Sequence, residues 1–253
     1  MREIKLNKKK VLLYDSIEEL PITRFHKYNK MILVDAGIGS DLAGLDRLIE
    51  RVARYVKKND LKNAEAELEN MRQNVYFIQN NISPRYLAFA ALVKSVDGVS
   101  CDDLSDDGLQ KIVNMLSDEN HKEVTDHLDS VKKKIDSELR EYFPVFFESS
   151  SVKEYYDMLK RRTTLILNKI TGKEKAGSDE IEKITDDLIL FNVPTKFTGK
   201  DGFEVNHDKQ FEKTCLLMSE NLHTDPKKFT VLAYYNALEY LKELAKKQNK
   251  KIK

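Results

Sequence analysis

Apolar residues repeat every seven positions through residues 42–82, and this spacing restricts the fold more than any other feature of the sequence. Side chains three and four positions apart lie on one face of an α-helix, so each such row predicts a helix with a single apolar stripe. The first row consists of Leu42, Leu45, Ile49, Val52 and Val56, and the second of Leu61, Ala64, Leu68, Met71, Val75, Ile78 and Ile82.

The polar pair Asn59 and Asp60 separates the two rows. A connection this short places consecutive helices side by side in opposite directions, so we predict an antiparallel helical hairpin whose stripes face each other. A core inside one chain is favoured over a coiled coil between chains. On this interpretation Leu68→Asp buries a charge between the helices and is severely destabilising.

The rest of the chain also favours long helices. Its 253 residues include only 9 glycines and 5 prolines, about half the usual share of these helix breakers. We therefore predict a mainly α fold, a helical bundle that contains the hairpin. Further helices are expected over residues 84–96, 105–116, 120–143, 151–172, 178–191 and 208–221, and from residue 225 towards the C-terminus.

Composition shifts divide the chain into three expected segments: an extended N-terminal arm (1–40), a helical body (41–172) and a C-terminal helical segment (178–253), with the polar residues 173–177 as the boundary. In the arm, residues 4–14 mix lysines with apolar side chains in an extended or edge-strand pattern. Gly37 and Gly39 separate the arm from the body and allow it to swing outward. Deleting residues 1–14 is then expected to leave the body folded and to impair assembly.

The C-terminal segment has one non-helical stretch, residues 193–206. Lys200, Asp201 and Gly202 stand there between two short stretches containing Phe197 and Phe203, a pattern that indicates a small β-hairpin. The segment ends in a basic tail, in which the last twelve residues hold six lysines and one glutamate. These basic residues, like those at the N-terminus, are candidates for non-specific contact with DNA phosphates, although a solvated tail is the commoner outcome.

Charge and composition exclude several classes of protein. Lys and Arg number 43 against 42 for Asp and Glu, and this net charge of +1 argues against a nucleic-acid coat or a polybasic membrane binder. The longest apolar run, residues 87–93, is far shorter than the ~20 residues of a membrane span, so no membrane contact is expected. Cys101 and Cys215 alone make no disulfide framework, and a reducing compartment is the simpler interpretation.

No motif predicts catalysis. The glycine turn at Gly37 and Gly39 lacks the Lys-Ser/Thr of a phosphate loop, and Asp41 at the expected helix cap repels an anion. The acids of residues 102–107 lack the bidentate ligand of a calcium loop, and a helix N-terminus explains them. None of the five histidines has a zinc-site spacing: His26, His121, His127, His207 and His223. We therefore expect a non-enzymatic protein with no catalytic residue, no cofactor and no metal.

Three groups of apolar and aromatic residues are candidates for contacts with other chains, because such side chains are enriched at interface cores. They are Val11, Leu12 and Leu13 in the arm, Phe25, Tyr28 and Met31 in the aromatic-basic stretch that follows, and Tyr234 and Tyr235 in the last helix. Packing of Phe25 and Met31 on the protein's own bundle is an equal alternative.

Four stretches of the chain carry a resemblance to a known family. They are EELPITRFHKYNKMILVDAGIGSD (18–41), ELENMRQNVYFI (67–78), LAFAALVKSVDG (87–98) and SVKEYYDMLKRRT (151–163). Together they resemble a virion protein family of crAss-like phages, the short-tailed double-stranded DNA phages of gut Bacteroidales. The resemblance extends over most of the chain and includes no catalytic motif.

This resemblance implies a structural protein of the portal vertex and tail, of the ring or adaptor type. It implies several copies in a cyclic homo-oligomer that contacts other portal and tail proteins, made in the cytoplasm of the infected bacterium and located in the virion. The alternative is an assembly chaperone or adaptor that binds another phage protein transiently. A ring component is present in purified virions at fixed stoichiometry, whereas a chaperone is not.

Overall fold

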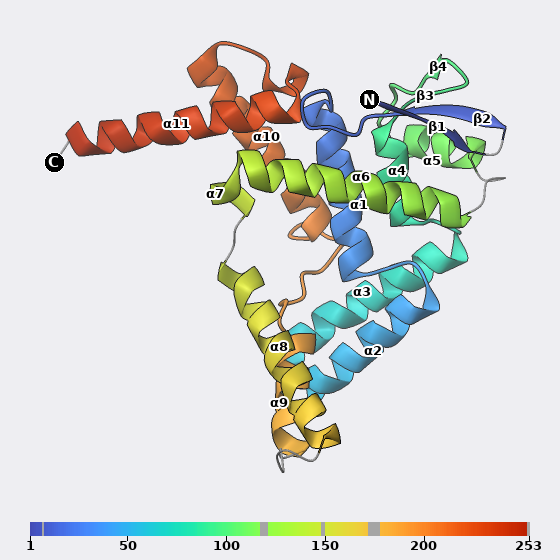
Figure 1. The fold of residues 1–253 in the computed structure, drawn as a ribbon, viewed down its shortest axis with the longest axis vertical. Coiled ribbons are helices and arrows are strands. Elements are labelled where there is room, and N and C mark those ends of the chain that lie inside the picture. Colours follow the sequence, from blue (N-terminus) through green and yellow to red (C-terminus); the bar gives the residue numbers. More distant parts are fainter. Residues whose placement is uncertain (7, 117–120, 148–149, 172–177, 252–253) are drawn as a thin grey trace.

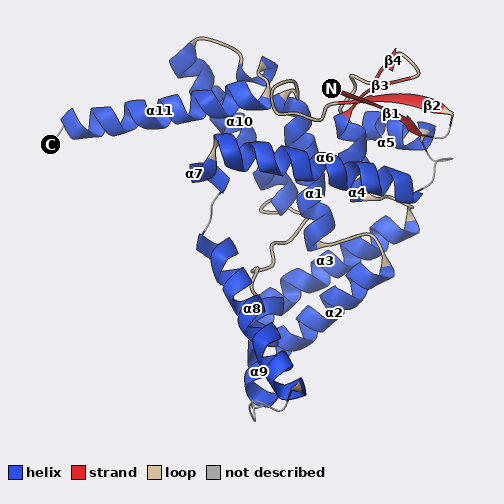
Figure 2. Cartoon of the chain, in the orientation of Figure 1, coloured by secondary structure: helices blue, strands red, loops and turns tan. Residues whose placement is uncertain are grey.

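The computed structural model describes residues 1–251 except 7, 117–120, 148–149 and 172–177. Figures 1 and 2 show a mainly helical molecule with one small antiparallel sheet at the N-terminus, which confirms the predicted fold class. The helices are α1 (Ile22–Gly37), α2 (Leu42–Lys57), α3 (Leu61–Gln79), α4 (Pro84–Leu92), α5 (Asp106–Met115), α6 (His121–Tyr142), α7 (Pro144–Phe147), α8 (Ser150–Ile170), α9 (Ser178–Ile189), α10 (Phe203–Leu222) and α11 (Val231–Lys251), with a short 3₁₀ turn at Pro226–Lys228.

The N-terminal segment is a folded part of the molecule, so the prediction of an extended arm over residues 1–40 is wrong. The sheet has the order β1 (Arg2–Leu6), β2 (Lys9–Leu13), β3 (Val93–Val96) and β4 (Val99–Ser100). Leu6, Val11 and Leu13 are fully buried beneath it. Residues 93–96, expected at the end of a helix, instead form the strand that pairs with β2 and holds it in place.

The segment between the sheet and α1 is also tied to the last helix. Ile22 donates its backbone N–H to the carbonyl of Phe229, and Val231 donates to the carbonyl of Leu20, both at 2.9 Å. The side chain of Arg24, one turn into α1, is buried and donates to the carbonyls of Val93 and Cys101. The first 40 residues thus form the centre of the fold.

One apolar core draws residues from all three predicted segments. It includes β1 and β2, α1, α4, α5, α6, α10 and the start of α11. In Figure 1, α6 crosses α1 and α4, while α11 leaves the body and projects to one side. The predicted division therefore cuts through a shared core, and its boundary at residues 173–177 lies outside the described residues.

The predicted β-hairpin over residues 193–206 is wrong. The described backbone is an irregular loop that closes on itself: Phe203 N–H donates to the carbonyl of Lys196 at 2.8 Å, and Gly202 N–H to that of Gly199 at 3.0 Å. Gly199 has a left-handed φ of +100°, and a Cβ on Gly202 would meet the backbone of Thr198. Because this loop leads straight into α10, Phe203 starts a helix where a second strand was expected.

The helical hairpin of α2 and α3 is confirmed, with a tight connection in which Asn59 adopts a left-handed φ of 56°. The orientation of its stripes was predicted wrongly. Leu48, Tyr55 and Phe77 are buried, as is Ala64 of the second row, and Met71 of that row packs on the same inner side. The positions that repeat every seven residues face solvent instead: Leu42, Ile49 and Val56 on α2, and Leu61, Leu68 (47% exposed) and Val75 on α3. Leu68→Asp therefore places a charge at the surface, and the expectation of severe destabilisation is withdrawn.

Candidate functional site

The residues predicted to contact other chains lie mostly inside this one. Val11, Leu13, Phe25, Tyr28, Met31 and Tyr234 are all buried, while Leu12 and Tyr235 are partly buried. The Tyr235 ring packs against Phe143, Phe146 and Phe147, with ring centroids 5.3–5.6 Å apart. These side chains stabilise the monomer, so the prediction that they form an interaction surface is wrong, and packing on the protein's own body is the outcome for Phe25 and Met31.

The exposed apolar surface lies instead on the outer side of the α2–α3 hairpin. We call it the hairpin face and define it by large apolar side chains that are at least one-third exposed there: Leu42, Ile49, Val56, Leu61, Leu68, Val75 and Tyr76. Leu42 (69% exposed) and Leu61 (64% exposed) are the most open of these. The sequence marks these residues clearly, but the same repeat is typical of a buried core.

Helix geometry places the exposed seven-residue positions of both rows on the side away from the body, although Ala64 and Met71 between them face inward. Residues two positions apart point about 160° apart around a helix. On α2, Arg51 contacts the carbonyl of Asn192 in the body, so Ile49 points outward. On α3, Asn70 contacts the loop at Thr195, so Leu68 points outward in the same way.

The inner side of the hairpin mixes an apolar cluster, which includes Leu48 and Phe77, with several buried polar groups. Glu67 is fully buried and its Oε1 lies 2.7 Å from Nε of Arg51. Burial raises the pKa of Glu67, and Arg51 opposes this shift. Asn70 Oδ1 accepts a hydrogen bond from Phe197 N–H at 3.1 Å, and Asn74 Nδ2 donates to the carbonyl of Ile38 at 3.0 Å. With these groups inward, the exposed seven-residue positions are left outward.

The hairpin face also contains a depression. A shallow depression of about 390 Å³ runs along α3, lined by Leu68, Met71, Arg72, Val75, Tyr76 and Gln79. Its floor is made of flexible apolar side chains and its edges are polar. Such a depression suits a side chain from a packed helix, because knobs on one helix insert into holes on another.

A cavity of about 340 Å³ lies behind the hairpin, between α1 and the loop of residues 192–197. Its charged lining residues, Arg51 and Glu67, are engaged with each other. The two thiols lie elsewhere: Cys101 and Cys215 are buried, and burial raises the pKa of both, so they stay protonated at neutral pH. The cavity therefore supplies a structural ion pair and no activated nucleophile among its described residues.

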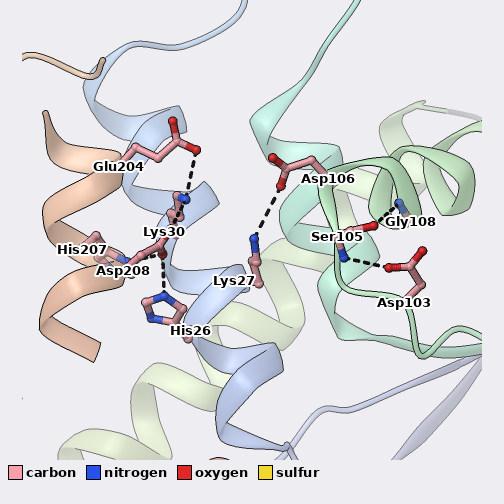
Figure 3. A network of polar contacts seen from close by, with 10 residues as sticks. All are labelled: His26, Lys27, Lys30, Asp103, Ser105, Asp106, Gly108, Glu204, His207 and Asp208. Carbon is pink, nitrogen blue, oxygen red and sulfur yellow. Dashed lines mark hydrogen bonds and ion pairs between the residues drawn. The ribbon is translucent and has the colours of Figure 1, made fainter. Parts of the chain in front are cut away.

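A second polar cluster joins α1 to α10 (Figure 3). His26 Nε2 lies 2.8 Å from Asp208 Oδ1, and Lys30 Nζ donates to Asp208 Oδ2 at 2.9 Å. Lys30 also pairs with Glu204 at 3.1 Å, and the ring of His207 stacks on that of His26 with centroids 4.4 Å apart. Lys30 is almost completely buried despite its charge.

Burial governs the charges in this cluster. It lowers the pKa of His26, and it lowers the pKa of His207 to about 4, so both rings are neutral at pH 7. Burial also opposes ionisation of Asp208, but hydrogen bonds from Lys30 and His26 outweigh it and hold the pKa of Asp208 below its usual value. No zinc-site spacing is visible in the sequence here, because His26 and His207 meet only in the folded chain.

The neighbouring acidic stretch serves as a helix cap, as Figure 3 also shows. Asp103 accepts a hydrogen bond from Ser105 N–H at 3.0 Å, and Ser105 Oγ accepts from Gly108 N–H at 3.1 Å. Asp106 lies 3.5 Å from Lys27 of α1. Ser105 therefore caps α5, the helix expected over residues 105–116, and the interpretation of the acids as a helix N-terminus is confirmed.

The fold and its surface define a mainly α-helical protein with an outward-facing apolar helical hairpin. Comparisons with protein-family models, curated proteins and solved structures returned no match. Among the described residues, no helix is both long and apolar enough to cross a membrane.

Proposed function

We propose that this chain is a non-enzymatic structural protein of a crAss-like phage virion, present in several copies in the ring or adaptor layer of the portal–tail assembly. The four stretches that resemble this virion family support the setting. The most clearly defined exposed feature of the helical body is an apolar face. Such a face supports a role based on contacts between proteins.

The hairpin face is the observation that carries the proposal. Contiguous apolar surface of this kind marks interaction sites on folded proteins. Two helices of 16 and 19 residues give a face about 24 Å long and 20 Å wide. A side of this size, roughly 500 Å², supplies more than half of the ~800 Å² per partner that a standard interface buries.

We assign a second copy of the chain as the occupant of this face. Ring symmetry requires a heterologous contact, in which one surface meets a different surface of the next copy. The projecting part of α11 supplies such a surface, because Figure 1 shows it leaving the body on the side away from the hairpin. Its Lys246 and Lys247 are exposed and complement in charge the exposed Asp46 on α2.

Size measurement tests the contact. Light scattering on the eluting protein is expected to show oligomers of wild type that dissociate in the double variant Leu68→Asp/Val75→Asp. The matched control is Thr163→Asp/Thr164→Asp, which adds the same charge at exposed positions of α8, away from the hairpin face. Equal oligomerisation of both variants, or a monomeric wild type at all concentrations, would contradict the assignment.

The virion setting has a separate test. Quantitative mass spectrometry of purified virions is expected to find the chain at a fixed ratio to the portal protein, and cryo-electron microscopy of the tail is expected to show its α2–α3 hairpin against a neighbouring copy. Absence from virions together with abundance in infected cells would favour the assembly chaperone instead.

A further inference from the structure

The polar cluster between α1 and α10 brings together three groups that ligate metals. One ring nitrogen each of His26 and His207 and one carboxylate oxygen of Asp208 lie within 4.8 Å of one another. Two of the separations are 2.8 Å, from His26 Nε2 to Asp208 Oδ1, and 3.9 Å, from His207 Nδ1 to the same oxygen. Ligands of a tetrahedral zinc ion stand about 3.4 Å apart, given bonds of about 2.1 Å. Because a ring nitrogen binds a metal in the plane of its ring, the His207 ring must also turn out of its stack on His26, in which the two rings lie 21° from parallel.

His207 contributes a separate observation. Its Nδ1 atom is buried and has no hydrogen-bond partner, although a buried polar atom normally has one. The atom lies beside the Asp208 carboxylate, and His207 is held in place by stacking on His26. A cation coordinated by this nitrogen satisfies it without moving either helix.

The surrounding residues fix the ligands as the outer shell of a metal site does. Phe211 stacks on the His26 ring with centroids 4.1 Å apart and holds its orientation. Lys30 binds the other oxygen of Asp208 and leaves Oδ1 directed at the histidines. Glu204 precedes His207 by three positions on α10, and a Glu-x-x-His pair on one helix is a known way to build metal sites in helical proteins. Glu204 pairs with Lys30 and lies close enough to balance added charge.

We propose that His26, His207 and Asp208 form a binding site for one divalent transition-metal ion, with zinc as the best match to two imidazoles and a carboxylate. The ion replaces the hydrogen atom between His26 Nε2 and Asp208 Oδ1, and that ring proton moves to His26 Nδ1. A water molecule or Glu204 supplies the fourth ligand. The metal thereby clamps α1 to α10, a structural role that goes beyond the proposed interaction function and does not depend on it.

The test uses the full chain without a histidine tag, stripped of metal by a chelator that is then removed. Zinc chloride is titrated by calorimetry, and thermal melts are recorded with and without zinc. The site variants are His26→Gln and His207→Gln. The matched control is His127→Gln, because His127 is also a partly buried helical histidine but lies on α6.

We expect one zinc ion per chain and a higher melting temperature with zinc for wild type and for His127→Gln. In both site variants the zinc affinity measured by calorimetry is expected to fall at least tenfold, and zinc is expected to cause no thermal shift. Without metal, both variants are expected still to melt cooperatively. Zinc binding that survives both site substitutions would overturn the proposal, as would the absence of saturable binding to wild type.

A second measurement covers the case in which a site variant does not fold. Cobalt(II) is added to the stripped wild-type chain, and its visible absorption reports the coordination geometry. We expect an intense spectrum typical of tetrahedral cobalt. It should disappear as one equivalent of zinc displaces the cobalt. A weak octahedral spectrum, typical of hydrated cobalt, would contradict the site whatever the variants do.

Discussion

Arg51 and Glu67 form a buried ion pair that holds α2 against α3, with Nε of the first 2.7 Å from Oε1 of the second. Two charges this far from water are tolerated only when they meet each other, because each alone carries a large desolvation cost. The pair lies on the inner side of the hairpin, where a sequence with apolar rows is expected to place leucine. Its position explains why the seven-residue positions of those rows point outward.

Breaking this pair is expected to destabilise the protein strongly. Glu67→Leu leaves the guanidinium of Arg51 half-buried without its partner, and we expect the free energy of unfolding to fall by about 3 kcal/mol. Urea denaturation measures the change. Glu65→Leu, two positions earlier and exposed, is the control and is expected to cost less than about 1 kcal/mol. Equal losses for the two variants would show that the buried pair contributes no more to the free energy of unfolding than an exposed acid does.

Charges introduced on the two sides of α2 and α3 are expected to differ in effect. Leu48 is 2% exposed and Leu68 47% exposed. Leu48→Asp is therefore expected to cost more than about 3 kcal/mol, whereas Leu68→Asp changes the free energy of unfolding by less than about 1 kcal/mol. Thermal and urea melts of dilute protein give both values. A strongly destabilised Leu68→Asp monomer would mean that the hairpin face is covered within the chain.

Removing residues 1–14 is expected to unfold the protein, which reverses the expectation from sequence. The deletion takes away β1 and β2 and leaves β3 with an unpaired edge. It also removes the fully buried Leu6, Val11 and Leu13, each worth roughly 1.5–3 kcal/mol of burial. Circular dichroism and a cooperative-melt assay check this result. A truncated chain that melts cooperatively at the wild-type temperature would restore the arm hypothesis.

Asp15 is expected to give the stability a dependence on acid. Burial pushes the pKa of this carboxyl up, but the hydrogen bond from Lys134 at 3.0 Å helps to hold it below its usual value. A lowered pKa means that the folded state binds the proton less readily than the unfolded chain does. The resulting stability is present above pH ~4 and is lost as the pH falls through the lowered folded pKa.

The variant Asp15→Asn is therefore expected to be less stable than wild type by about 1–2 kcal/mol at pH 7. As the pH falls below the usual aspartate pKa of about 4, this difference is expected to shrink, because the wild-type carboxyl is progressively protonated as well. Urea melts at pH 7 and below this pKa measure it, with Asp129→Asn, from the exposed pair with Arg85, as the control. A difference that stays constant with pH would exclude the titration of Asp15 as its cause.

Local signals predicted the helices well. Asp41 accepts a hydrogen bond from Gly44 N–H, Ser83 from Tyr86 N–H and Ser105 from Gly108 N–H, so each capping residue does start the helix expected after it. The connection at Asn59 also turns as its composition indicates. These features depend on residues within one helical turn, and the sequence displays them directly.

Relationships between distant residues were not predictable in the same way. A seven-residue repeat predicts which side chains share a helix face. It does not predict whether that face contacts solvent or another part of the protein. Glu67 and Asn70 are inward because Arg51 and the loop at Thr195 supply their partners. The arm assignment failed for a related reason, since Val11 and Leu13 pair with residues near Val93 that have helical spacing in the sequence. The cluster of His26 and His207 depends on the docking of α10 against α1, for which the sequence has no local signal.

The hydrogen bonds between Leu20 and Val231 and between Ile22 and Phe229 also set the order of events during synthesis. At 5–20 residues per second a ribosome needs roughly 10–50 s to reach residue 230. During that time β1, β2 and α1 have been made but α11, which completes their core, has not. Part of their apolar surface is therefore exposed to solvent. A chaperone that holds nascent chains is therefore expected to engage the first 40 residues before the last helix is made.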